Sequence, residues 1–306
     1  MDNHNKIPVT VITGFLGAGK TTFINKILKN NPETKFALIE NEFGDVAIDS
    51  KLIKGVEASQ MFELKDGCIC CTISNEFELA LAELAEKFPD VDHLLIETTG
   101  IADPGPVIRP FFADENLKKY YHFNGTVCLA DAKYFHRYPA KKIAIKQLAV
   151  ADVVVITKAE DFSQQQKEQF QLEVKQFNPF AGFFFSAFGK VPEFNLLNIQ
   201  QKPLRYIIAD NIAHEKLQVK TIRLGRPVNK EEFTDWLGYN LDLYKNEIYR
   251  VKGILCFENE PYQFHLQGVG GSFEMEESDD LTTGSDSWIV FIGSLNQLDL
   301  SSFTPA

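Results

Sequence analysis

The segment Gly14–Thr21 has the residue types and the spacing of a loop that binds phosphate groups. Its glycines let the backbone turn so that N–H groups point at phosphate oxygens, and a following helix adds the positive end of its dipole. Lys20 would neutralise the outer phosphates, and the Thr21 hydroxyl would bind Mg²⁺. The residues expected to bind the nucleotide here are Gly17, Ala18, Gly19, Lys20, Thr21 and Thr22. The segment therefore predicts a nucleotide-binding enzyme.

A second motif, Glu97-Thr-Thr-Gly100, follows an apolar run. Nucleotide hydrolysis needs a carboxylate near the metal ion and a donor to the terminal phosphate, and such groups gather where the strands of a parallel sheet end. Glu97 would polarise water or hold Mg²⁺ through water, and Gly100 would donate its N–H to the terminal phosphate. The predicted catalytic residues are Lys20, Glu97 and Gly100.

The segment Thr157-Lys158-Ala159-Glu160 also ends an apolar run, and it is similar to the Asn-Lys-x-Asp loop with which GTPases bind guanine. A carboxylate in this loop accepts hydrogen bonds from guanine N1 and N2, which adenine cannot supply. Glu160 stands in the place of the aspartate and reaches one methylene further, and Ser186 fits a loop behind the base. We expect the base to be bound by Thr157, Lys158, Glu160 and Ser186, with GTP favoured over ATP.

Three cysteines stand within four residues, at Cys68, Cys70 and Cys71. In a cytosolic chain such a cluster is more typical of metal or redox chemistry than of a disulfide framework. Thiolates suit Zn²⁺ or Cu(I), and a tetrahedral site needs a fourth ligand, which Glu40 or Glu42 would supply as a carboxylate. Adjacent Cys70 and Cys71 cannot both reach one ion easily, so two or three thiols per metal ion is the geometric limit. A redox-sensing thiol pair and inert cysteines stay open as alternatives.

The segments that must position these residues alternate between strand-like and helix-like patterns. Short apolar runs predict strands at Ile7–Thr13, Phe36–Ile39, His93–Ile96, Thr126–Ala130, Val153–Ile156 and Phe183–Phe185. Helical spacing is found at Thr21–Lys29, Asn75–Lys87 and Gln164–Gln176. Continuously apolar strands alternating with helices are typical of a mostly parallel sheet covered on both faces. The predicted fold class is α/β, of the P-loop NTPase kind, with a smaller C-terminal α+β domain.

After about residue 195 this alternation weakens, which indicates a change of domain. Strands are predicted at Val219–Leu224, Gly253–Phe257, Tyr262–Leu266 and Trp288–Ile292, with a helix at Lys230–Leu237. The acidic run Glu274–Asp280 is predicted to be a solvated loop. We therefore expect a nucleotide-binding domain at residues 1–200, a linker at 201–215 and an α+β domain at 216–306.

The composition is that of an ordinary globular protein, with 306 residues, 44% hydrophobic residues and a net charge of −11. The negative charge argues against broad attraction to nucleic acid or to an anionic membrane, because both need a cationic surface. The N-terminal residues lack the pattern of a signal peptide, and no stretch reaches the length of a membrane span, so a cytoplasmic location is expected. Cys128 and Cys256 lie in apolar runs and are expected in the core.

Taken together, the motifs resemble the CobW family of GTPases, which covers the cobalamin-synthesis protein W group and the zinc-regulated GTPase metalloprotein activators. The matching segments are Gly14–Thr22, Glu40–Gly44, Gly67–Cys71, Glu97–Pro104, Thr157–Lys158, Arg250–Gly253 and Phe264–Val269. They occur in the order and spacing of that family and cover nearly the whole chain. The Cys-x-Cys-Cys motif beside a phosphate loop is specific to it.

The resemblance implies a slow GTP hydrolase with bound Mg²⁺, acting as a metallochaperone that delivers Zn²⁺ or a related transition metal to a client protein. It also implies that Glu40, Cys70 and the neighbouring Cys68 and Cys71 are metal ligands. Two features depart from the family. The guanine loop reads Thr-Lys-x-Glu, and the six histidines are scattered, which argues against bulk metal storage.

Three other functions are alternatives to a GTPase metallochaperone. A small-molecule kinase would use the same phosphate loop. An interaction module would be switched by the nucleotide and would carry a structural zinc. A thiol redox sensor would use the cysteines without metal. None of them explains Glu40, the three cysteines and the guanine-like loop together as well as a GTPase metallochaperone does. The strands of the second domain offer a surface for docking of a client protein or for self-association as a homodimer.

Overall fold

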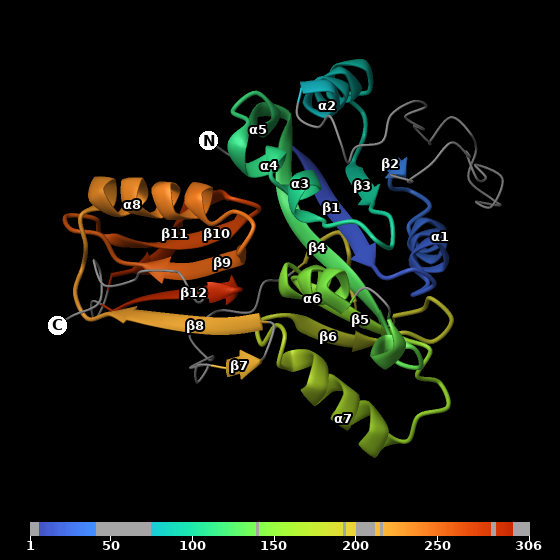
Figure 1. Ribbon diagram of the computed structural model, residues 1–306. Coiled ribbons are helices and arrows are strands. Elements are labelled where there is room, and N and C mark those ends of the chain that lie inside the picture. The colour runs from blue at the N-terminus through green and yellow to red at the C-terminus, as the bar shows by residue number, and fades with distance from the viewer. Residues whose placement is uncertain are drawn as a thin grey trace. The chain divides into compact units, whose positions relative to one another are not determined.

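The computed structural model describes residues 6–40, 75–138, 141–191, 194–199, 212–214, 217–282 and 286–295. The chain divides into two compact units (Figure 1). Residues 1–173 with 181–201 form the first unit, and residues 174–180 with 202–306 form the second. Each unit has its own sheet and its own hydrophobic core. The domain limits given above remain predictions.

The first unit contains a six-stranded sheet in the order β2-β3-β1-β4-β5-β6, and its strand pairs are all parallel. Its strands are β1 (Ile7–Gly14), β2 (Phe36–Glu40), β3 (His93–Glu97), β4 (Tyr121–Asp131), β5 (Val153–Thr157) and β6 (Gly182–Phe185). The parallel sheet and all of its predicted strands are confirmed. β1 lies at the centre, between β3 and β4, so the loop after it lies where the strand order reverses and ligands gather.

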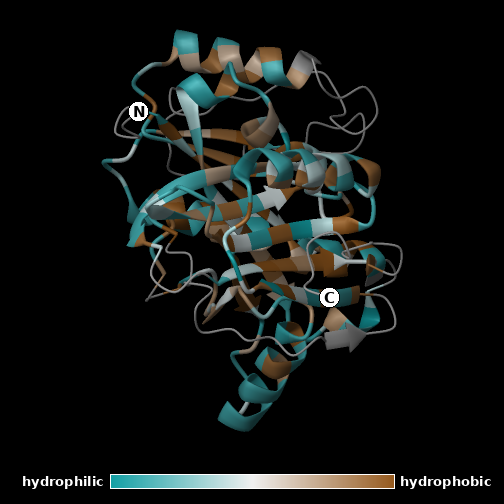
Figure 2. Cartoon of the chain, turned by 90° about the vertical axis from the view of Figure 1, so that its left-hand side faces the viewer, coloured by the Kyte–Doolittle hydropathy of each residue, from teal (hydrophilic) through white to brown (hydrophobic). Residues whose placement is uncertain are grey.

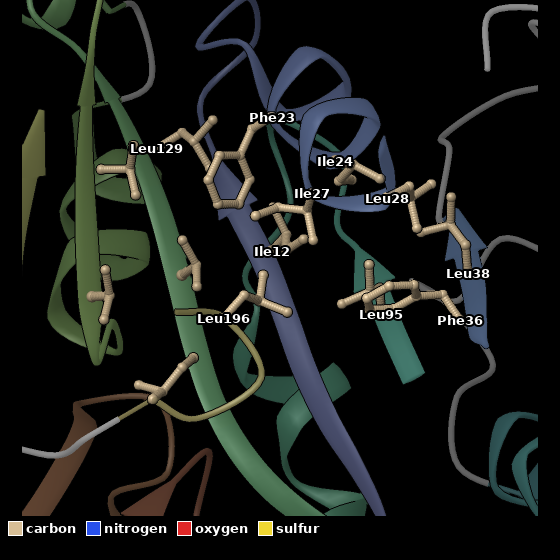
Figure 3. Close-up of a cluster of buried hydrophobic side chains, with 14 of the residues drawn as sticks. Ile12, Phe23, Ile24, Ile27, Leu28, Phe36, Leu38, Leu95, Leu129 and Leu196 are labelled. Carbon is tan, nitrogen blue, oxygen red and sulfur yellow. The ribbon is translucent and has the colours of Figure 1, made fainter. Parts of the chain in front are cut away.

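The helix that follows β1, α1 (Lys20–Asn30), is fixed to the sheet by its apolar side (Figure 3). Phe23, Ile24 and Ile27 recur at helical spacing and pack with Ile12 and Leu95 of the sheet. Burying each such side chain stabilises the fold by about 1.5–3 kcal/mol, and Phe23→Ala would cost about 3–5 kcal/mol. Packing of α1 therefore fixes the position of its first turn at the end of β1.

Six further α-helices are described in the first two-thirds of the chain. They are α2 (Asn75–Lys87), α3 (Gly105–Ile108), α4 (Pro110–Ala113), α5 (Leu117–Tyr120), α6 (Lys141–Ala149) and α7 (Gln164–Lys175). The predicted helices that correspond to α1, α2 and α7 are confirmed, whereas α3–α6 were not predicted. At the bottom of Figure 2, α7 is mostly teal, because its sequence is rich in Gln, Glu and Lys.

The second unit contains an antiparallel sheet in the order β11-β10-β9-β12-β8-β7. Its strands are β7 (Ile212–His214), β8 (Leu217–Leu224), β9 (Ile248–Leu255), β10 (Tyr262–Val269), β11 (Ser272–Leu281) and β12 (Ser287–Gly293). The helix α8 (Lys230–Leu243) is capped by Asn229, whose side chain accepts hydrogen bonds from the backbone N–H groups of Glu231 and Glu232. Phe233 and Leu237 of α8 share the core with the strands. The predicted α+β character is confirmed.

The prediction of a solvated loop at Glu274–Asp280 was wrong, because these residues form most of β11. β11 pairs antiparallel with β10 through a two-residue turn at Gly270-Gly271, where both glycines have the positive φ that such a turn requires. Among the described strands β11 is at the edge of the sheet. Acidic side chains on an edge strand disfavour pairing with other chains, so a charged run and a strand are compatible there.

Among the described helices, none combines the length and the apolar composition needed to cross a membrane.

Candidate functional site

The loop between β1 and α1 has the backbone conformation of a phosphate cradle. Gly14, Gly17 and Gly19 have φ angles of 138°, 75° and 97°, a region that side-chain-bearing residues rarely adopt. Lys20 is only 8% exposed, and its Nζ donates to the Gly14 carbonyl at 3.0 Å. The ammonium group is therefore held across the loop, at the position where phosphate charge would be neutralised. Phe15 anchors the loop by stacking on Tyr138, with ring centroids 4.2 Å apart.

Glu97 lies beside the first turn of α1, as the sequence suggested. The Thr21 hydroxyl donates to Glu97 Oε1 at 3.5 Å. β1 and β3 run side by side and bring Ile12 into register with Glu97, so both chain segments reach the same edge of the sheet. A hydroxyl and a carboxylate are the hard oxygen ligands that Mg²⁺ prefers. The donor set of Thr21 and Glu97 therefore fits Mg²⁺.

The segment after Glu97 is fixed by buried hydrogen bonds. Thr98 is fully buried; its N–H donates to the Ile12 carbonyl, and its hydroxyl donates to Thr13 Oγ1 at 2.9 Å. Gln147 of α6 is 1% exposed, and its Nε2 donates to the carbonyls of Gly100 at 3.3 Å and Ala102 at 3.1 Å. Sequence reasoning missed Gln147, because its helix was not predicted and a lone glutamine has no distinctive pattern.

Gly100 also lies unusually close to the phosphate loop. A Cβ atom added at Gly100 would lie 2.4 Å from the Leu16 nitrogen and 2.6 Å from the Leu16 Cα. Such contacts are shorter than van der Waals packing allows. Glycine is therefore required here by close approach of two backbones, which places the predicted catalytic Gly100 against the nucleotide loop.

Thr157 connects the predicted base loop to the phosphate loop. Its hydroxyl donates to the Ala18 carbonyl at 2.8 Å and is 3.3 Å from the Ala130 carbonyl. The Thr157 hydroxyl thus supplies a hydrogen-bond donor to a carbonyl of the phosphate loop. Lys158 follows with a φ of 57°, and its Nζ is 2.6 Å from Asp131 Oδ2. Thr157 and Lys158 thus lie together at the end of β5.

Asp131 is a residue of this site that the sequence did not reveal. It ends β4 and is 1% exposed, and its other carboxylate oxygen accepts from the N–H groups of Lys133 and Tyr134. The Tyr134 ring lies beneath the Lys158 ammonium, 5.5 Å from Nζ to the ring centroid. A buried carboxylate that is hydrogen-bonded and paired with a cation is stable. Asp131 therefore fixes where the Lys158 side chain lies.

The two carboxylates after Lys158 have different partners. Asp161 forms an ion pair with Lys133 at 2.8 Å, and this hydrogen-bonded partner lowers the pKa of the Asp161 carboxyl. Glu160 instead accepts a hydrogen bond from the Phe188 N–H at 3.4 Å. Ser186, in the same turn as Phe188, accepts from the Gly189 N–H at 3.0 Å. The structure thus brings Glu160 and Ser186 together and directs Asp161 elsewhere.

Of the predicted zinc ligands, only Glu40 lies within the described residues; Cys68, Cys70 and Cys71 lie outside them. Glu40 ends β2 and is in register with Glu97 of the adjacent parallel strand β3. The described part of the chain holds no group of three or more His, Cys, Asp or Glu side chains placed to bind a metal. Cys128 and Cys256 are 2% and 1% exposed, as predicted, and burial raises the pKa of the Cys128 thiol to about 12.

Two protein-family models match this chain. Residues 8–185 match the model described as "CobW/HypB/UreG, nucleotide-binding domain", and residues 217–303 match "Cobalamin synthesis protein cobW C-terminal domain". The first match includes the phosphate loop, Glu97 and the base loop. The second covers the described strands β8–β12 of the second unit.

Individual relatives are similar over almost the whole chain. The chain is 35% identical to the zinc chaperone YjiA of Escherichia coli, over 94% of each chain. It is 28% identical to the zinc-regulated GTPase metalloprotein activator 1 of Saccharomyces cerevisiae, over 95% of this chain and 81% of that protein. Among solved structures, the Zn(II)-bound YjiA GTPase from E. coli superposes with a TM-score of 0.69 at 30% identity, over 94% of each chain.

Proposed function

The chain belongs to the CobW family of nucleotide-binding proteins, and on that premise we propose that it is a metal-binding GTPase. It hydrolyses GTP and acts as a metallochaperone that delivers Zn²⁺, or a related transition metal, to a client protein. The observation that carries the link between nucleotide and metal is the register of β2 and β3. It sets Glu40, which precedes the cysteine segment, beside Glu97, which belongs to the nucleotide site.

The nucleotide site divides into groups for the phosphates and groups for the base. The phosphates are bound by the backbone of Gly17–Thr22 and by the Lys20 ammonium, which now rests on the Gly14 carbonyl at 3.0 Å. Thr21 and Glu97 would hold Mg²⁺, which neutralises phosphate charge when bound. For the base, Glu160 accepts from guanine, with Lys158 and Ser186 beside it.

Hydrolysis in this site depends mainly on positioning and on charge, as in other phosphoryl transfers. Glu97 orients the attacking water, and the Gly100 N–H donates to the terminal phosphate. Both groups belong to one short segment that Thr98 and Gln147 fix through buried hydrogen bonds. Because only GTP has a terminal phosphate at this place, the segment distinguishes GTP from GDP.

Metal binding is coupled to the difference between the GTP-bound and the GDP-bound protein. Zn²⁺ is the cargo, and Glu40 with the thiolates of Cys68, Cys70 and Cys71 forms its ligand set. Two carboxylates on adjacent strand ends repel each other, and a cation bound to either of them relieves that repulsion. The two sites therefore share a coupling free energy, which by linkage acts equally in both directions. Thiolate ligation releases protons, so Zn²⁺ affinity falls at low pH.

The test is anaerobic purification of the full chain, followed by Zn²⁺ titration with a GTP analogue and with GDP. We expect Zn²⁺ affinities that differ between the two nucleotides, together with phosphate release from GTP in preference to ATP. Equal Zn²⁺ affinities would contradict the coupling. Glu40→Gln should weaken Zn²⁺ while GTP still binds, and Cys256→Ala, at a buried thiol of the second unit, is the matched control.

The same samples test the interaction module with a structural zinc. If Cys70→Ser lowers the melting temperature as much as it lowers Zn²⁺ affinity, the metal is structural and not cargo. A client metalloprotein as the partner, a homodimer and a cytoplasmic location are further parts of the proposal. Size-exclusion chromatography with each nucleotide tests the homodimer.

A further inference from the structure

Phe188 is an aromatic residue whose side chain has no evident role in stabilising the fold. It is 82% exposed, the highest value for any large apolar residue in the described part of the chain. Its φ angle is 51°, in the left-handed region that bulky residues rarely adopt. An exposed ring gains no burial energy, and a strained backbone at such a residue is often found at functional sites.

The turn that carries Phe188 is held in place at several points. The Phe188 N–H donates to Glu160 Oε1 at 3.4 Å, and the N–H groups of Ala187 and Lys190 each donate to the other residue's carbonyl at 3.0 Å. Gly189 packs against α1, since a Cβ added there would lie 3.0 Å from the Thr22 carbonyl oxygen. The backbone of the turn that carries the exposed ring thus contacts both the carboxylate assigned to guanine and the helix assigned to the phosphates.

The other exposed aromatic residue near the base loop already has partners. Tyr134 is 51% exposed, and its ring has the Lys158 ammonium at 5.5 Å and the Arg137 guanidinium at 6.0 Å. Within the described residues, no aromatic or cationic group packs on the Phe188 ring in this way. Phe188 therefore has an exposed apolar ring, and its own backbone N–H is bonded to Glu160.

We propose that Phe188 is the stacking platform for the nucleotide base. This inference rests on the proposed GTPase function and adds a binding residue to its site. Glu160 reads the hydrogen-bonding edge of guanine, and the Phe188 ring covers its face, which a carboxylate cannot do. Stacking on an aromatic ring is tolerant of base identity, whereas hydrogen bonding to the edge is not. Phe188 contributes affinity, and Glu160 contributes selectivity.

The test compares nucleotide affinities of full-length variants by calorimetry. Phe188→Ala should weaken GTP, GDP and ATP by a similar factor, about 5- to 150-fold, as for other base–aromatic stacks. Phe188→Tyr should restore wild-type affinity, because the ring remains. Glu160→Gln should weaken GTP and GDP but not ATP. Leu172→Ala, at an apolar side chain that is 58% exposed on α7, is the matched control and should change nothing.

Kinetics add a second measurement. Because the base is stacked equally in the ground state and the transition state, Phe188→Ala should raise KM with kcat unchanged. If the wild type binds GDP and Phe188→Ala binds it with the same affinity, the stacking inference is overturned while the proposed function stands. Absence of GTP and GDP binding in the wild type would instead refute the proposed function.

A fluorescent variant, Phe188→Trp, keeps the inference testable if Phe188→Ala fails to fold. Phe188→Trp adds a tryptophan to the two of the native sequence. Stacking on guanine should change its fluorescence when GDP is added, relative to wild type. No change in that fluorescence, with GDP bound, would also overturn the inference.

Discussion

Gly100→Ala tests whether the close approach of the segment after β3 to the phosphate loop matters for hydrolysis. The added Cβ would lie 2.4 Å from the Leu16 nitrogen, about 1 Å short of ordinary van der Waals contact. Gly100 is not among the residues with positive φ, so alanine is acceptable to its own backbone and the effect is steric. Since the obstructing atoms belong to backbone, one of the two segments must move.

The size of the effect follows from that displacement. Overpacking of this kind costs about 1–3 kcal/mol of stability. A misplacement of about 1 Å at groups that position the reaction lowers the rate by about 100-fold. We therefore expect Gly100→Ala to fold with a lowered melting temperature and to lose about 100-fold in kcat for GTP. Affinity for GDP, which lacks the terminal phosphate, should change much less.

Phosphate release under saturating GTP is the assay, with circular dichroism to confirm folding at the assay temperature. Gly225→Ala is the matched control, because a Cβ there meets no atom within 4 Å and its φ is not left-handed. A folded Gly100→Ala protein with wild-type kcat would refute the reasoning that these two segments must approach this closely for catalysis.

Three further changes have defined outcomes. Thr157→Val removes the hydroxyl that donates to Ala18, so it should lower stability by about 1–3 kcal/mol in urea unfolding and weaken GTP, whereas Thr157→Ser should restore both. Gln147→Leu removes the two hydrogen bonds to the segment of Gly100, so calorimetry should show weaker binding of a GTP analogue with GDP binding unchanged. Burial, with a smaller effect of a neighbouring histidine, lowers the pKa of His93 from 6.5 to about 3. Between those pH values the unfolded chain binds the extra proton. The free energy of unfolding is therefore highest above pH 6.5 and falls by about 1 kcal/mol per pH unit as the pH drops below it. His93→Gln should flatten that slope in urea titrations, and an unchanged slope would contradict it.

Much of the fold follows from local chemistry. The apolar run at β1, the glycines of the next loop and the helical spacing after Lys20 together predict a strand, a cradle and a helix, and all are found. The prediction of a loop at the acidic run Glu274–Asp280 was wrong, because charge indicates solvent exposure but does not exclude an edge strand. α6 was missed, because its length and pattern are too weak to stand out in sequence.

The sequence by itself predicted the phosphate loop, the parallel sheet and the candidate residues for nucleotide and metal, since glycine conformation, hydrophobic period and ligand chemistry are properties of short segments. Only the tertiary structure decided which distant groups meet. Thr157 donates to Ala18 across 139 positions, Gln147 to Gly100 across 47, and Phe188 to Glu160 across 28. Such pairings depend on strand order and on the packing of helices, which bring together groups that no local pattern connects.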